Sequence, residues 1–310
     1  MRKLIVVVVL LCLPACRGGE PAATSTAPET ESLVVRVASY DLAVGEQRFI
    51  AGLLTQDNQF VSHGETTLEF AFIGTSDREV APDFSLREEA KFLPIPGEPE
   101  EARSGPVIGP ASQGRGVYSA VVEFDRAGFW RVRARAEVEG QELIGTGAFE
   151  VLEEHAVPAP GDLAPKTETL TLGSDAPRAA IDSRAVNGEI PDPELHDSTI
   201  AQAIAARRPA VAVFSTPLFC VSKFCGPVTD MVLELSRNYS DRAAFIHVEI
   251  WRDFEGKVVN KSAAEWVVVN GDLQEPWVFL IGADGRILER WDNVATRGEI
   301  EPELKKLSTG

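Results

Sequence analysis

Residues 210–228 read Ala-Val-Ala-Val-Phe-Ser-Thr-Pro-Leu-Phe-Cys-Val-Ser-Lys-Phe-Cys-Gly-Pro-Val. The apolar run at the start, 210–214, is typical of a strand buried on both faces. A loop with two cysteines follows. A helix is predicted to begin at Cys225-Gly226-Pro227, because proline in the first turn of a helix loses no hydrogen bond there. We therefore expect Cys225 to lie where free N–H groups at the helix start stabilise a thiolate.

Strands and helices are predicted to alternate around this stretch, from residue 167 to residue 310. The further predicted elements are an Ala-rich helix over 200–208 capped by Asp197, a buried strand over 243–250, a hairpin over 277–290 and a helix over 298–307. This order of strands and helices indicates an α/β domain in packed layers.

Two motifs in this part of the chain carry a family resemblance. Phe224-Cys225-Gly226-Pro227 after an apolar strand resembles the Trp-Cys-Gly-Pro motif of the thioredoxin-like superfamily. Members of that family place a cis-proline before the next central strand, and Pro276 stands in that position here. The resemblance covers about residues 170–310. It implies a thioredoxin-like fold, a reactive cysteine and a groove for substrate shaped by Pro276.

The position of the second cysteine departs from the family pattern. In Cys-x-x-Cys thioredoxins it follows Gly-Pro directly, and Val228 occupies that position here. The partner lies upstream instead, as Cys220-x4-Cys225, a spacing that can reach disulfide geometry. We therefore expect thiol–disulfide exchange, with Cys225 as the nucleophile and Cys220 as the resolving cysteine. The resemblance does not determine the reduction potential of the pair.

Other functions remain open for the same pair. A static disulfide in a non-catalytic binding or assembly module is one, although a disulfide that closes so short a loop stabilises little. Peroxiredoxins use Pro-x-x-x-Thr-x-x-Cys, which Pro217 and Ser222 approach with a spacing one residue too long. Copper chaperones on this fold use two loop cysteines and a distant histidine. A Cu(I) site of Cys220, Cys225 and His247 is therefore a further alternative.

Two histidines near the predicted site give less specific predictions of function. His247 lies in the strand predicted over 243–250, and His196 precedes the helix predicted over 200–208. A lone histidine in a buried strand is more often a core residue. His247 and Glu249 share one strand face and are alternatively a proton relay near the thiols. No organic cofactor is expected, because no glycine-rich phosphate loop follows a strand at the required spacing.

Residues 33–152 are predicted to be β throughout. Short runs that alternate between apolar and polar residues are separated by glycine-containing turns, a pattern that favours an antiparallel sandwich. Residues 114–151 resemble the immunoglobulin-type modules of bacterial envelope proteins. His63 is the one histidine here and supplies a single ligand, so we expect no metal site but a spacer or docking module.

The start of the chain predicts export and anchoring. Residues 1–15 combine two basic residues with an apolar run too short to span a bilayer, which indicates a signal peptide. Leu13-Pro14-Ala15-Cys16 resembles a bacterial lipobox, which implies lipidation of Cys16. Residues 16–32 are rich in small residues and predict a flexible tether. A second linker, rich in proline, is predicted over 153–166.

Composition is consistent with this location. The chain has 310 residues, enough for two domains, and a net charge of −17, which argues against a nucleic-acid partner. Of the four cysteines, Cys12 leaves with the signal peptide and Cys16 carries lipid. Cys220 and Cys225 then remain as thiols in an oxidising compartment. The expected partners are protein thiols and disulfides of the cell envelope, with the protein lipid-anchored on the extracytoplasmic face of a membrane.

Overall fold

The computed structural model describes residues 32–98, 105–110 and 114–308. The predicted signal peptide, the lipidation residue Cys16 and nearly all of the predicted tether lie outside the described residues. From residue 31 onward the chain forms one compact unit. None of the helices in the described part of the chain combines the length and the apolar character needed to cross a membrane.

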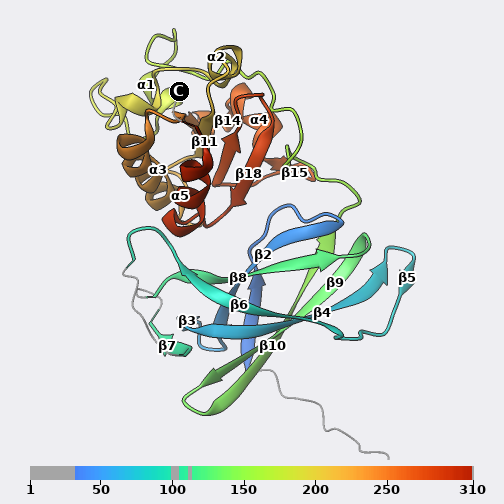
Figure 1. The fold of residues 1–310 in the computed structure, drawn as a ribbon. Coiled ribbons are helices and arrows are strands. Elements are labelled where there is room, and N and C mark those ends of the chain that lie inside the picture. Colours follow the sequence, from blue (N-terminus) through green and yellow to red (C-terminus); the bar gives the residue numbers. More distant parts are fainter. Residues whose placement is uncertain (1–31, 99–104, 111–113, 309–310) are drawn as a thin grey trace, which may run out of the picture. The chain divides into compact units, whose positions relative to one another are not determined.

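A single antiparallel sheet of ten strands dominates the described residues (Figure 1). Its strands are β1 (Leu33–Val37), β2 (Gly45–Thr55), β3 (Phe60–Ser62), β4 (Glu65–Thr75), β5 (Arg78–Glu79), β6 (Leu86–Pro94), β7 (Val107–Gly109), β8 (Gly116–Phe124), β9 (Gly128–Val138) and β10 (Gln141–Val151). The hydrogen-bonded order is β10-β9-β4-β6-β8-β2-β3-β7, and β1 and β5 pair with β2 and β4. Period-2 alternation along β9 buries one residue in two and leaves the others toward solvent.

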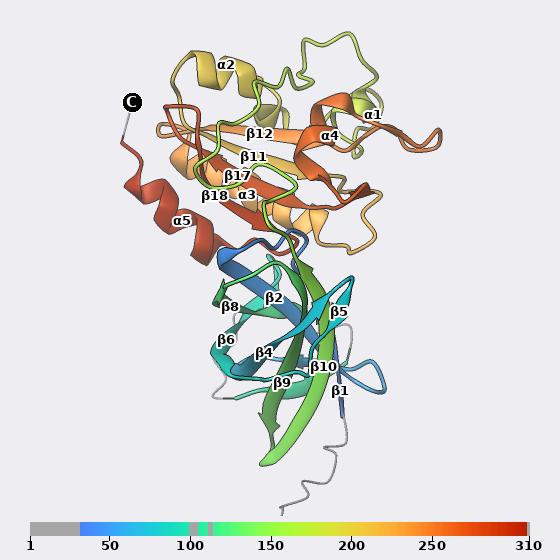
Figure 2. The same cartoon turned by 90° about the vertical axis from the view of Figure 1, so that its right-hand side faces the viewer.

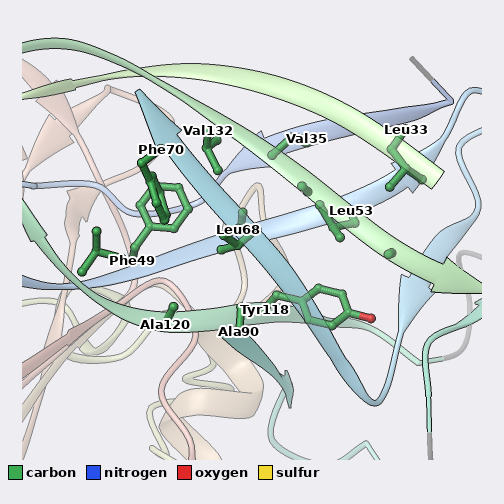
Figure 3. Close-up of a cluster of buried hydrophobic side chains, with 14 of the residues drawn as sticks. Leu33, Val35, Phe49, Leu53, Leu68, Phe70, Ala90, Tyr118, Ala120 and Val132 are labelled. Carbon is green, nitrogen blue, oxygen red and sulfur yellow. The ribbon is translucent and has the colours of Figure 1, made fainter. Parts of the chain in front are cut away.

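An aromatic and aliphatic core lies on the inner face of this sheet (Figure 3). Phe49 and Phe70 meet edge to face, with their ring centroids 4.9 Å apart. Both side chains are fully buried, as is Tyr118, whose hydroxyl donates a hydrogen bond of 2.7 Å to the carbonyl oxygen of His63. Burial of large aromatic side chains supplies much of the stabilisation of a sheet of this kind.

The predicted fold class is wrong. The structure is mostly β, with 42% strand and 17% helix, and an α/β thioredoxin-like fold in the C-terminal half is not supported. The N-terminal half has one continuous sheet of ten strands in place of two facing sheets. Alternation along a strand identifies the residue that faces the core but does not identify the neighbouring strand. The predicted sandwich and the predicted α/β domain both depended on that missing information.

The C-terminal half contains a smaller sheet, of β11 (Ala210–Ser215), β12 (Ala244–Glu249), β17 (Trp277–Ile281) and β18 (Ile287–Asp292). Its order is β12-β11-β17-β18, and only the pair β11–β12 is parallel. Two short ribbons accompany it: β13 (Trp251–Asp253) with β14 (Val258–Val259), and β15 (Val268–Val269) with β16 (Asp272–Leu273).

Helices pack on both faces of the small sheet (Figure 2). They are α1 (Arg178–Ile181), the 3₁₀ turn η1 (Pro193–Leu195), α2 (Ile200–Ala205), α3 (Cys225–Tyr239), α4 (Lys261–Val267) and α5 (Arg297–Lys306). Side chains of α2 and α4 share one hydrophobic cluster with alternate residues of β11, and side chains of α3 and α5 share a second cluster with the intervening residues. Strand β11 is therefore buried on both faces, as its apolar sequence predicts.

Two helix starts are fixed by capping boxes. Thr199 caps α2: its hydroxyl accepts from the amide of Gln202, whose side chain accepts from the amide of Thr199. The predicted cap, Asp197, is therefore wrong by two residues. Thr296 and Glu299 form the corresponding box at α5, which covers nearly the predicted range.

Buried ion pairs connect segments far apart in the sequence. Asp41, between β1 and β2, pairs with the guanidinium of Arg290 in β18 at 2.8 Å and lies 3.2 Å from His155. Arg48 of β2 pairs with Asp292 and with Glu299 of α5. Because the side chain of Asp41 is fully buried, its carboxylate depends on these partners.

Candidate functional site

The topology of the small sheet brings the cysteine loop beside the start of β17. β11 runs antiparallel to β17, and Phe214 at the end of β11 is paired with Trp277 at the start of β17. The loop that leaves β11 therefore lies next to the segment that enters β17. That segment contains the Glu275–Pro276 peptide bond, which is cis. The cis-proline predicted at position 276 is confirmed.

Helix α3 begins at Cys225, as predicted from the Cys-Gly-Pro sequence. The Cys225 side chain is fully buried, whereas Cys220 in the preceding loop is partly exposed, and both are free thiols. The loop around Cys220 is open to solvent: Leu218 is 62% exposed and Val221 is 93% exposed. The Cys220 sulfur is therefore the one that a macromolecular partner can reach.

Several hydrogen-bond donors converge on the Cys220 sulfur. The backbone N–H of Cys225 lies 3.4 Å from it, and the Ser222 hydroxyl lies 3.2 Å from it. The Cys225 thiol donates to the same sulfur and is the largest cause of a pKa lowered to about 5 for Cys220. Cys220 is therefore a thiolate at neutral pH.

The buried Cys225 thiol shows the opposite shift. Burial raises its pKa, and the neighbouring Cys220 thiolate raises the pKa further. These directions reverse the expected roles, in which Cys225 was the activated nucleophile. The helix start does stabilise a thiolate, but its free N–H group points at the cysteine upstream. The first helical residue carries its own side chain into the protein interior.

Glu275 completes the site. One of its carboxylate oxygens and the two cysteine sulfurs all lie within 4.8 Å of one another. Burial raises the pKa of Glu275 to about 8, with further contributions from the charges of Cys220 and Glu249. Its buried Oε2 atom has no hydrogen-bond partner. A carboxyl group with this pKa exchanges its proton readily near neutral pH.

Tyr40 links the site to the N-terminal part of the chain. Its hydroxyl donates a hydrogen bond of 2.7 Å to the Glu275 carbonyl oxygen, and its backbone amide donates to Asp292 at 2.6 Å. The Tyr40 ring lies 5.8 Å from the ring of Trp277, centroid to centroid. Burial, followed by the charges of Asp292 and the cysteines, raises the pKa of the Tyr40 phenol. Tyr40 therefore stays protonated and holds the strand entry as a donor.

The predicted Cu(I) ligand set is not brought together. Among the described residues, the groups close enough to share an ion place Cys220 and Cys225 with Glu275, and place His247 in a different group. The His247 ring contacts Asp182 at 3.4 Å and the Ser215 carbonyl oxygen at 3.3 Å. His196, the other histidine singled out, belongs to the group of His247.

The proposed relay between His247 and Glu249 is not formed by hydrogen bonds. The carboxylate of Glu249 instead accepts hydrogen bonds from the backbone amides of Ser183, at 2.8 Å, and Trp251, at 3.2 Å. Burial raises the pKa of Glu249. Its charge also contributes to the raised pKa of Glu275, so Glu249 acts on the site electrostatically.

Sequence reasoning did not identify Glu275, Tyr40 or Asp182. Glu275 was within reach of it, because the family resemblance implies that Pro276, the next residue, lies beside the cysteines. Tyr40 precedes the cysteine loop by about 180 residues and no local pattern connects the two. Asp182 lies in a long segment of irregular structure, where periodicity gives no information.

Comparison with known proteins does not assign the chain to a family. No protein-family model matches the chain, and no match was found among curated proteins.

Proposed function

We propose that this protein carries out thiol–disulfide exchange with protein substrates through Cys220 and Cys225. One observation carries the proposal: the partly exposed Cys220 is held as a thiolate, with a pKa of about 5, against a buried cysteine that remains a thiol. A static disulfide needs no such difference between its two cysteines. An exchange reaction does, because one sulfur must attack the substrate first.

The first step uses the exposed sulfur. The Cys220 thiolate attacks one sulfur of a substrate disulfide, so a bond forms between Cys220 and that sulfur while the substrate S–S bond breaks. The other substrate sulfur leaves as a thiolate and takes a proton from solvent. The product is a mixed disulfide on the exposed loop.

The second step uses Cys225 and Glu275. Formation of the mixed disulfide removes the negative charge of Cys220, which contributes to the raised pKa of Glu275. The carboxyl group then gives its own proton to solvent more easily. The resulting carboxylate accepts the proton of the Cys225 thiol, which lies within 4.8 Å. The Cys225 thiolate attacks the Cys220 sulfur and releases the second substrate thiolate. The substrate disulfide is reduced and the Cys220–Cys225 pair is oxidised. Oxidation of a substrate dithiol is the reverse.

We also propose that the exchange takes place on the extracytoplasmic side of a membrane, with the protein held by a lipid on Cys16. The support is the sequence Leu13-Pro14-Ala15-Cys16 after an apolar run, followed by a tether of small residues. Radioactive palmitate is expected to label the chain in bacteria and to leave a Cys16→Ser variant unlabelled. Equal labelling of both chains would contradict the anchor.

The exchange proposal is tested by a redox titration. The purified chain is equilibrated in glutathione buffers and the oxidation state of Cys220–Cys225 is read by thiol alkylation and mass spectrometry. We expect a reduction potential above about −300 mV, together with reduction of oxidised glutathione that a Cys220→Ser variant lacks. A potential well below about −300 mV indicates a structural disulfide and would overturn the proposal.

A further inference from the structure

A second cluster of chemically active side chains lies apart from the cysteines. Its members are Asp182 after α1, Asp192 before η1, His196 after η1 and His247 in β12. All four side chains are buried, with at most 1% of each residue exposed. One ligand atom from each lies within 4.8 Å of the ligand atoms of the other three. Three segments of the chain therefore bring two imidazoles and two carboxylates together.

The distances within the cluster do not match hydrogen bonds. Nδ1 of His247 lies 3.4 Å from Oδ2 of Asp182, and Nε2 of His196 lies 3.6 Å from the same oxygen. Nε2 of His196 is 3.7 Å from Oδ1 of Asp192. In a hydrogen bond between an imidazolium and a carboxylate, the nitrogen and oxygen atoms lie about 2.7–2.9 Å apart. Tetrahedral zinc with bonds of about 2.0–2.1 Å holds its ligand atoms about 3.3–3.4 Å apart.

Several atoms of the cluster also lack partners. Both ring nitrogens of His196, Nδ1 of His247 and Oδ1 of Asp192 are buried and make no hydrogen bond. Buried polar atoms nearly always have a partner, and an ion is one of the explanations for atoms that do not. Three of them, Nε2 of His196, Nδ1 of His247 and Oδ1 of Asp192, are among the atoms separated by 3.4–3.7 Å, and the fourth such atom, Oδ2 of Asp182, accepts a hydrogen bond from Arg184.

The surroundings orient the ligand atoms toward a metal. Nε2 of His247 faces the Ser215 carbonyl oxygen at 3.3 Å, and since a carbonyl only accepts, Nε2 carries the proton. Nδ1 then presents its lone pair to the cluster, as in many metal-bound histidines. Arg184 donates to both carboxylates and binds Asp192 through Oδ2, which leaves Oδ1 for an ion. Two carboxylates and one guanidinium leave a net charge of −1, which suits a divalent cation.

We propose that Asp182, Asp192, His196 and His247 bind one Zn²⁺ ion in a closed, structural site. Imidazole nitrogens and carboxylate oxygens are both zinc ligands, and four protein ligands that leave no open position are typical of a metal that stabilises a fold. The site would also fix one wall of the cysteine loop. The hydroxyl of Ser183, next to Asp182, accepts a hydrogen bond of 3.2 Å from the backbone amide of Leu218. The backbone amide of Ser183 donates a hydrogen bond to the carboxylate of Glu249.

The test removes the thiols first, because cysteines also bind zinc. The full chain carrying Cys220→Ser and Cys225→Ser is stripped with a chelator and dialysed against Zn²⁺, and bound metal is measured by elemental analysis. We expect one ion per chain. Co²⁺ in its place is expected to give the visible bands of a tetrahedral ion without a thiolate charge-transfer band.

Matched variants assign the site. His196→Gln and Asp192→Asn in the same background are expected to lower the affinity at least about 10–100-fold. His155→Gln, at a histidine outside the cluster, is expected to leave it unchanged. Circular dichroism of each chain verifies that it is folded. Less than stoichiometric zinc in the folded parent chain, or equal affinity in His155→Gln and His196→Gln, would overturn the proposal.

Discussion

The thiols of Cys220 and Cys225 have opposite pKa shifts because their side chains differ in burial and because the hydrogen bonds between them run from Cys225 to Cys220. Cys220 is partly exposed and receives donors, whereas Cys225 is buried and supplies two of them, its thiol and its backbone amide. Alkylation by iodoacetamide is therefore expected to modify Cys220 alone, at a rate that falls as the pH drops through about 5. A Ser222→Ala variant, which removes one donor, should move this midpoint upward. Peptide mass spectrometry at each pH measures which cysteine is alkylated and the midpoint of the pH dependence. Preferential labelling of Cys225 would contradict the assignment.

Glu275 is the second residue whose chemistry depends on its neighbours. With oxidised glutathione as the substrate, Glu275→Gln is expected to leave the first attack unchanged and to slow the resolving step by about 10²–10⁴-fold. The mixed disulfide should then accumulate. In the unmodified chain the resolving rate should rise with pH, with a midpoint below about 8, because the charge of Cys220 is absent at that step.

Acid quenching and mass spectrometry measure the two steps separately. Glu255→Gln, at an exposed glutamate, is the matched control and should behave like the unmodified chain. If Glu275→Gln resolved the mixed disulfide at the normal rate, another group would have to accept the Cys225 proton.

At the scale of elements, the start of α3 is tied to the end of β11. The Thr229 hydroxyl donates to the Cys225 carbonyl oxygen at 2.8 Å and lies 2.6 Å from the Ser215 hydroxyl, all within the core. Thr229→Val removes the partner of Ser215 and should lower the free energy of unfolding by about 1–3 kcal/mol. Adding Ser215→Ala should recover most of that loss, because no hydroxyl is then left unpaired.

Urea unfolding of the two single variants and the double variant measures this coupling. Additive losses in the double variant would show that the two hydroxyls act independently.

The sequence predicted the elements around the site better than their assembly. The strand at 210–214 and the helix from Cys225 follow from local chemistry, namely an apolar run and a proline at a helix start, whereas the cis-proline at 276 was expected from the family resemblance. The prediction of the fold class was wrong because strand pairing is non-local and cannot be read from alternation along one strand. Helices α1, α2 and α4 have at most seven residues, too few for a clear helical period in the sequence. The pKa shifts of the two cysteines are opposite to those expected, since side-chain depth is set by tertiary packing.

For the whole molecule, buried ion pairs make stability depend on pH. Although burial alone would raise it, the pKa of Asp41 is lowered to about 2 by contacts with His155 and Arg290. A carboxylate with a lowered pKa stabilises the fold above its ordinary value, 3.8, and this contribution disappears as the pH falls toward about 2.

Asp41→Asn is therefore expected to lower the free energy of unfolding at neutral pH by about 2 kcal/mol. The difference from the unmodified chain should shrink as the pH falls from about 4 to about 2. Urea titrations across this range measure it. A difference that stays constant with pH would contradict the ionic origin of the effect.

The unequal depth of the two sulfurs also has a practical consequence for finding substrates. A substrate bound to Cys220 sits on the open loop with Leu218 and Val221, whereas its release requires the buried Cys225. A Cys225→Ser chain is therefore expected to retain its substrates covalently in living cells. Non-reducing gels should show these adducts as bands that disappear with dithiothreitol, and the bands should be missing when Cys220→Ser is added. Mass spectrometry of the bands would then name the proteins on which this chain acts.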